Sequence, residues 1–341
     1  MDETRCHYPR SNSLKDSIQA TLDGIVANKS KAAKFYLDTL EEQDHPNLYG
    51  EDHHQGLARS HRLSDGSVYF FLTHSKLTRN KKGELMQFRY GGPLEESQIV
   101  QTNPLTVAPL EQLLELNERH PSDVVFLPEV NNEDAGYIFV THEYDQRRVA
   151  VYQWEPGSQF NNLGTVFAGL PNNGPAFVFL DLVGDIYYLG IADTEGTCVV
   201  FQAQAKQLFR TCTKGEINLC AFCRMGEYPF PNTNGACQVK LVQDSTSNWY
   251  LLGFRSDPDD DPNGTDYVDV YGIKFTPFFI TPLMFSVHVF FPTGDTGFAN
   301  TGTHYIEPSG RMLLSSSYRW SEDEGPGNSG YVSRVDEVPS W

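Results

Sequence analysis

The segment Tyr69-Phe70-Phe71-Leu72-Thr73-His74 decides how this chain is interpreted, because four later segments repeat its pattern. Each is a run of apolar and aromatic residues that ends in a polar tip, and such runs are typical of buried β-strands. The later tips are His142, Asp193, Arg255 and Tyr318, so consecutive tips are 68, 51, 62 and 63 residues apart. A recurring step of this size indicates an internal structural repeat.

A strand is also predicted before each run, and a loop with another strand after it. Four of the five preceding strands begin alike, with an amide or hydroxyl group, then glycine, then a small residue two positions further on. These glycines are Gly56, Gly174, Gly235 and Gly302. The second copy departs from the pattern, and Asp123 is its only comparable polar group. Glycine fits places where backbones approach closely, so we expect these first strands to lie innermost.

The recurrent step and the shared strand order resemble the β-propeller superfamily over residues 53–341. The resemblance implies an all-β, five-bladed β-propeller with a short N-terminal helical segment. No subfamily motif, such as a Trp-Asp dipeptide or a kelch double glycine, recurs in the repeats. No functional residue therefore carries over from a family, and a pair of β-sandwich domains stays open as an alternative.

Helix is predicted in two places. Apolar spacing indicates helix from Ser13 to about Glu42, divided in two near Gly24 and Asn28. A second, short helix is predicted from Pro109 to Arg119, because proline favours the first turn of a helix. We therefore expect an N-terminal helical extension over residues 1–45, packed on one propeller domain over residues 46–341.

The fifth repeat shows only three strands before the chain reaches Trp341. A strand from the region Asn47–Tyr49 is predicted to complete this sheet and close the ring. Closure would remove two unpaired sheet edges, which are a liability in soluble proteins.

The charge of the chain limits its partners. Its 341 residues carry 26 Lys and Arg against 44 Asp and Glu, a formal net charge of −18. This field repels nucleic acids and anionic membranes, so we expect neither as a partner and expect a monomer. The polar start of the chain lacks the apolar region of a secretory signal. We expect a cytoplasmic location, although secretion stays open if a leader has been removed.

The strand directions predict where a site would lie. A first strand and the second strand that returns beside it are antiparallel, so the start of one and the tip of the other share a face. We expect His54, His74, His142 and His304 to meet there as candidate catalytic acids or bases. The predicted substrate-binding residues are Gln55, Arg59, Asn173, Asn234, Asn300 and Tyr318. Two alternatives stay open: the imidazoles bind a metal, or they only order water in a channel.

Two further motifs suggest metal ions, although no cofactor is required. The sequence Asp259-x-Asp261-x-Asn263-Gly264 matches the first half of a calcium loop, but Val270 replaces the closing Glu. The alternative is a solvated acidic loop. A zinc site of four thiolates is less favoured than packed free cysteines, because the spacing is irregular. The thiols concerned are Cys212, Cys220, Cys223 and Cys237.

These observations favour a non-redox enzyme of lyase, isomerase or cyclase type, which holds a small, partly apolar molecule in the central funnel and uses His as acid and base. The five tips differ, which favours one asymmetric site over five equivalent ones. One alternative is a lectin-like propeller that binds a ligand or carbohydrate without catalysis. The other is a glycosidase, which needs two converging carboxylates; Asp52, Glu143 and Asp193 are the candidates.

Overall fold

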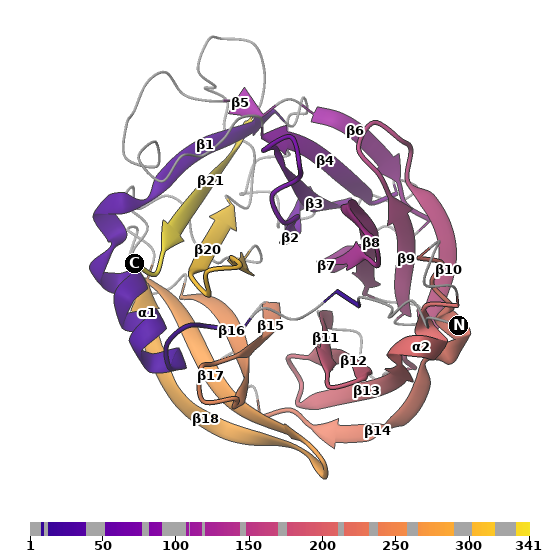
Figure 1. Cartoon of the computed structure of the whole chain (residues 1–341). Helices are drawn as coiled ribbons and strands as arrows, with labels where there is room; N and C mark the ends of the chain where they lie inside the picture. Colours follow the sequence, from indigo (N-terminus) through magenta and orange to yellow (C-terminus); the bar gives the residue numbers. More distant parts are fainter. Residues whose placement is uncertain are drawn as a thin grey trace, which may run out of the picture.

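The chain forms five sheets arranged as blades around one axis (Figure 1). The computed structural model describes residues 8–9, 13–38, 52–76, 82–90, 107–108, 110–117, 120–143, 148–169, 176–210, 215–231, 238–257, 265–289, 302–317 and 332–341. The innermost strands contact one another in the order of the sequence, and the last contacts the first. The predicted five-bladed β-propeller is confirmed.

Four blades are four-stranded meanders. Blade one contains β2 (Asp52–Arg59), β3 (Val68–Lys76), β4 (Glu84–Tyr90) and β6 (Leu110–Glu115). Blade two contains β7 (Pro121–Glu129), β8 (Asn132–His142), β9 (Arg148–Trp154) and β10 (Asn161–Phe167). Blade three contains β11 (Ala176–Val183), β12 (Ile186–Asp193), β13 (Thr197–Gln204) and β14 (Cys223–Pro229). Blade four contains β15 (Gln238–Gln243), β16 (Trp249–Asp257), β17 (Thr265–Phe275) and β18 (Phe278–Val289).

The fifth blade joins both ends of the chain. Its strands are β19 (Gly302–Ile306), β20 (Met312–Ser317), β21 (Val332–Pro339), β1 (Ala33–Asp38) and the short β5 (Val107–Ala108). β1 pairs antiparallel with β21, with Ala33 opposite Glu337. An N-terminal strand thus closes the ring, as expected, but it is Ala33–Asp38. The region Asn47–Tyr49 lies outside the described residues.

The N-terminal helix is shorter than the sequence suggested. α1 (Ile18–Ala27) begins after Ser17, whose side chain accepts a hydrogen bond from the Ala20 amide. It buries Ile18, Leu22 and Ile25, and the 3₁₀ turn η1 (Lys29–Lys31) follows. The predicted second helix, reaching to about Glu42, is wrong because Ala33–Asp38 is strand. The sheet therefore begins well before the expected boundary at residue 45.

The predicted helix over Pro109–Arg119 is also wrong. Leu110–Glu115 forms β6, which pairs antiparallel with β4 and alternates half-buried with exposed side chains. This alternation is the period of a strand. Among the described helices, including α2 (Ala205–Leu208) and the 3₁₀ turn η2 (Leu219–Ala221), none is long and apolar enough to cross a membrane.

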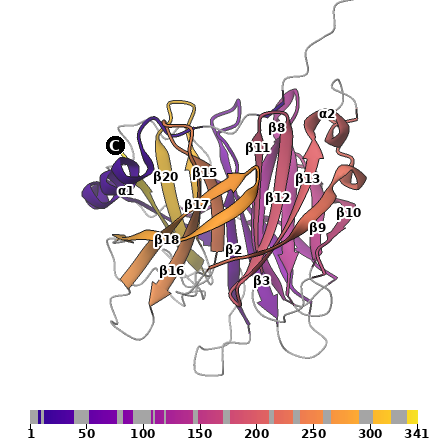
Figure 2. The ribbon, with the colours of Figure 1, turned by 90° about the horizontal axis from the view of Figure 1, so that it is seen from below.

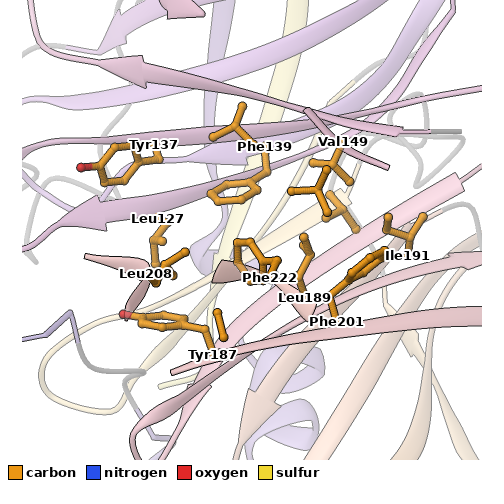
Figure 3. Packing of buried hydrophobic residues seen from close by; sticks show 14 of the residues in the cluster. Leu127, Tyr137, Phe139, Val149, Tyr187, Leu189, Ile191, Phe201, Leu208 and Phe222 are labelled. Atoms are coloured by element: carbon orange, nitrogen blue, oxygen red, sulfur yellow. The ribbon is translucent and has the colours of Figure 1, made fainter. Parts of the chain in front are cut away.

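Aromatic and aliphatic side chains fill the spaces between blades. Between blades two and three the cluster includes Phe139, Leu189 and Phe201, all buried (Figure 3). Gly56 shows why the innermost strands need small residues, because a Cβ there would lie 2.8 Å from the Cα of Asp123 in blade two. The strands of Gly56 and Gly302 lie innermost, as predicted; Gly174 and Gly235 fall outside the described residues.

The blades present two different faces. At the end that we call the loop face, the first strands begin and the second strands end. At the opposite end, the turn face, the connections include a short one, residues 130–131 between β7 and β8, and a long one from β13 to β14 that contains α2 and η2. Figure 2 shows the blades from the side, with α2 at the turn face.

Candidate functional site

The strand register brings the expected residues of blades one and two to the loop face. His54 of β2 lies opposite His74 of β3, and the two ring centres are 5.4 Å apart. Pro121 of β7 lies opposite His142 of β8. The start of the first strand and the tip of the second therefore share a face, as their directions require.

His74 forms a buried pair with a carboxylate of the next strand. Its Nδ1 lies 3.1 Å from Oε2 of Glu84, and Nζ of Lys76 donates to Oε1 of Glu84 over 2.6 Å. Burial raises the pKa of Glu84, but the hydrogen bonds from His74 and Lys76 outweigh it and hold the pKa below its usual value. The ionised carboxylate favours the proton on Nδ1 of His74. Nε2 is buried with no hydrogen-bond partner within the described part of the chain, which leaves its lone pair available as a base.

A second imidazole–carboxylate pair lies in blade two. Nδ1 of His120 is 3.0 Å from Oε2 of Glu143, and the Ser122 hydroxyl donates to Oε1 of Glu143 over 2.7 Å. The other ring nitrogen of His120 lies 3.1 Å from the side-chain nitrogen of Gln55, which joins this pair to blade one. His120 and Glu143 are both buried. Sequence reasoning missed His120, because it stands before the second tip and outside the repeated motif.

His142 is held neutral. Burial, helped by the charge of Arg148, lowers the pKa of His142 to about 3. Its Nδ1 has no hydrogen-bond partner among the residues described. A neutral imidazole at this position can accept a proton only weakly, so His142 fits a binding role better than that of the base.

Two side chains of blade four cross the axis. The Gln238 amide nitrogen donates to the carbonyl of Gln55 in blade one, and its oxygen accepts from the Gly302 amide in blade five at 2.5 Å. Lys240 reaches blade two, where Nζ donates to Oδ1 of Asp123 over 2.6 Å. Blades one and two are not neighbours of blade four, so these contacts span the channel.

The Lys240–Asp123 pair is fully enclosed. Burial raises the pKa of Asp123 and lowers that of Lys240. The second oxygen of Asp123 accepts from the Val178 amide of blade three over 3.2 Å. Asp123, the only polar group of the irregular second copy comparable to those of the other copies, therefore ties three blades together.

Arg59 and His304 lie away from the other predicted residues. Both line a cavity of about 200 Å³ in the channel, whose walls include none of His54, His74 or His142. Nε of Arg59 is 3.0 Å from Oε2 of Glu337, and its guanidinium stacks 4.3 Å from the Tyr305 ring centre. Burial, and secondarily Lys240, lowers the pKa of His304 to about 4. The expected single ring of four imidazoles is therefore divided between two places.

The remaining predicted groups are outside the described residues or lack a metal-binding arrangement. Cys220 and Cys223 are exposed free thiols. Within the described ranges, no three His, Cys, Asp or Glu side chains are grouped so as to hold a metal ion. The predicted residues outside those ranges are Asn173, Asn234, Asn300, Tyr318, Asp259, Asp261, Asn263, Cys212 and Cys237.

Of the carboxylates considered for a glycosidase, Glu143 lies beside the His120 imidazole. Oδ1 of Asp193 accepts the amides of Glu195 and Thr197, each at 3.0 Å, and so stabilises the turn after β12. The Asp52 side chain falls outside the described residues. Glu84, which the sequence did not single out, is a buried carboxylate beside the His74 imidazole.

No protein-family model and no curated protein matches this sequence. Solved structures do resemble it. A fructofuranosidase from Schwanniomyces occidentalis, complexed with fructosylnystose, is 12% identical with a TM-score of 0.50, over 83% of this chain and 55% of that one. An α-L-arabinofuranosidase from Podospora anserina is 8% identical with a TM-score of 0.49, over 92% of this chain and 99% of that one. At these identities the comparison shows a shared fold alone, and that fold is the five-bladed propeller.

Proposed function

We propose that this protein is a glycosidase whose site lies at the loop face of blades one and two. One observation carries the proposal: two buried imidazole–carboxylate pairs, His74–Glu84 and His120–Glu143, stand at the same end of neighbouring blades. The sequence favoured a lyase, isomerase or cyclase. The carboxylates beside the imidazoles favour the glycosidase alternative instead, because glycoside hydrolysis needs one group that takes a proton and another that gives one.

The carbohydrate class is part of this proposal. The fructofuranosidase that shares the fold was solved as a complex with fructosylnystose. For this chain we propose only the class of substrate, a carbohydrate.

The roles follow from the geometry of each pair. Nε2 of His74 removes a proton from water, which attacks the anomeric carbon, while Glu84 holds the ring through Nδ1. The pair His120–Glu143 delivers a proton to the departing oxygen, so that the glycosidic bond breaks as the new C–O bond forms. His74 is the proposed catalytic base, and Glu84 is a positioning residue.

A panel of aryl furanosides and pyranosides of both anomeric forms tests the proposal. We expect release of the aryl group from at least one substrate, and a loss of about 100-fold or more in kcat for His74→Ala. Glu84→Gln should shift the acidic limb of the kcat–pH profile. If the melting temperature of this variant is unchanged, such a shift shows that Glu84 acts on His74 and does not only stabilise the fold. Glu115→Gln, at an exposed carboxylate paired with Lys82, is the matched control and should leave the rate unchanged. A panel without turnover would overturn the glycosidase proposal.

A carbohydrate-binding propeller without catalysis is the second candidate. It is favoured by one feature: both oxygens of Glu84 and both of Glu143 already have partners inside the protein. Such satisfied networks also serve as rigid frames for binding. Binding of oligosaccharides in a calorimeter, with no product formed, would decide for this candidate.

A further inference from the structure

The turn-face half of the channel contains a cavity that lies apart from the imidazole–carboxylate pairs. The cavity of about 200 Å³ is lined by all five innermost strands. Lys240 lines it, whereas Gln238 and Gln55, which lie nearer the loop face, do not. The two transaxial contacts of blade four therefore stand between this cavity and the imidazole–carboxylate pairs. We call it the turn-face cavity.

Several polar groups in this cavity lack partners. Both ring nitrogens of His61 and Nδ1 of His304 are buried with no hydrogen-bond partner among the described residues. Asp181, by contrast, has a partner, because its Oδ1 accepts from the adjacent Leu182 amide at 2.7 Å. Buried polar atoms normally have partners, so these groups call for water or for a ligand with hydroxyl groups.

The cavity carries almost no unbalanced charge. Arg59 faces Glu337 at 3.0 Å, and Lys240 faces Asp123 at 2.6 Å. Burial raises the pKa of Asp181 to about 8 and lowers that of His61. At neutral pH these groups are uncharged, and each can both donate and accept a hydrogen bond. The described wall of the cavity therefore offers no unpaired charge to bind an ionic ligand.

The rest of the wall is apolar and partly aromatic. Phe126, Phe179 and Tyr305 contribute rings, and Leu180 contributes aliphatic surface. Apolar walls with a few neutral donors and acceptors are typical of small-molecule sites. The volume holds several waters, each of about 30 Å³, or one monosaccharide. We propose that the turn-face cavity binds a neutral, polyhydroxylated molecule of monosaccharide size, independently of the site at the loop face.

Two described residues near the N-terminus, Tyr8 and Pro9, lie at this cavity or beside it. Pro9 lines it, and the Tyr187 hydroxyl donates to the Pro9 carbonyl over 3.1 Å. The Tyr8 ring lies 6.2 Å from that of Phe209 and fixes the segment to blade two and three side chains. In Figure 1 the short indigo piece of this segment crosses the centre of the ring.

The experiment uses the full chain and a set of neutral monosaccharides and inositols, with binding followed by saturation-transfer NMR and calorimetry. We expect at least one of these compounds to bind. Asp181→Asn and His304→Phe should each raise its dissociation constant at least 10-fold. Leu180→Trp, which fills the cavity, should abolish binding. Glu155→Gln, at an exposed carboxylate of the turn face, should leave it unchanged.

Each outcome separates this proposal from the glycosidase. The proposal for the turn-face cavity would be overturned if all three variants kept their melting temperatures and still bound the ligand. These variants are Asp181→Asn, His304→Phe and Leu180→Trp. A panel in which nothing binds the unaltered chain would also overturn the proposal. If Leu180→Trp fails to fold, Asp181→Asn and His304→Phe alone test whether the ligand binds in the turn-face cavity. Aryl-glycoside turnover depends on His74 and is measured separately, so either proposal can fail without the other.

Discussion

At the scale of residues, Lys240 is a charged side chain in a buried strand whose partner could not be predicted from the sequence. It stands in the apolar strand Gln238–Gln243. Its side chain reaches across the channel to the buried carboxylate of Asp123. A lone Lys in a buried strand was a usable signal, but its partner is 117 residues away, and no local pattern connects the two.

Lys240→Met should destabilise the protein strongly. The change leaves Asp123 buried without its counter-charge, and breaking a buried pair in this way costs about 3–5 kcal/mol. The free energy of unfolding in urea measures it. The double variant with Asp123→Asn should recover much of the loss. Lys82→Met removes an exposed pair with Glu115 and should cost less than about 1 kcal/mol; equal losses for the two lysines would contradict the transaxial role.

Asp181 predicts a dependence of stability on pH. Burial raises its pKa from 3.8 to about 8. Between these values the folded state holds a proton that the unfolded state has lost, so stability falls as the pH rises from 4 to 8 and then levels off. We expect unfolding free energies of the native chain and of Asp181→Asn to diverge over this window, the native chain losing stability relative to the variant. Parallel curves would show that the carboxyl is ionised in the folded protein.

At the scale of elements, the sequence misplaced two strands for one physical reason. Ala33–Asp38 and Leu110–Glu115 both lie at the outer part of a blade, where the neighbouring strand decides the conformation. In the second of these, Leu110, Leu113 and Leu114 have the spacing of a helix face. Local preference is weak, and pairing with β4 overrides it. The central strands were identified correctly because their apolar runs leave no helical alternative of sufficient length.

Leu37→Ala tests the closing strand. Leu37 is fully buried and packs in the cluster with Leu57, Phe70 and Val335. Truncating a buried leucine costs about 2–5 kcal/mol, and here the loss also loosens the seam between β1 and β21. Leu113→Ala is the matched control, because that side chain is 41% exposed on another outer strand. Thermal and urea unfolding of both variants measure the difference, and equal effects would mean that β1 does not hold the ring.

At the scale of the whole molecule, the repeat predicted the architecture and the strand directions predicted the loop face. The five tips sufficed for the fold because every blade repeats the same meander. The pairs at the site could not be predicted in the same way. Glu84 and His120 belong to no repeated motif, and the separation of the turn-face cavity from the imidazole–carboxylate pairs depends on side chains that cross from one blade to a distant one.

The closure of the fifth blade also determines how the molecule would respond to mechanical force. The first residue of β1, Ala33, lies opposite Glu337, near the end of β21. The two chain ends therefore leave the seam at the same end of the sheet. A pull on both ends loads the hydrogen bonds of this seam one after another, as in opening a zipper, and not all together in shear. Tension applied to β1 and β21 at that end would thus open the seam one hydrogen bond at a time.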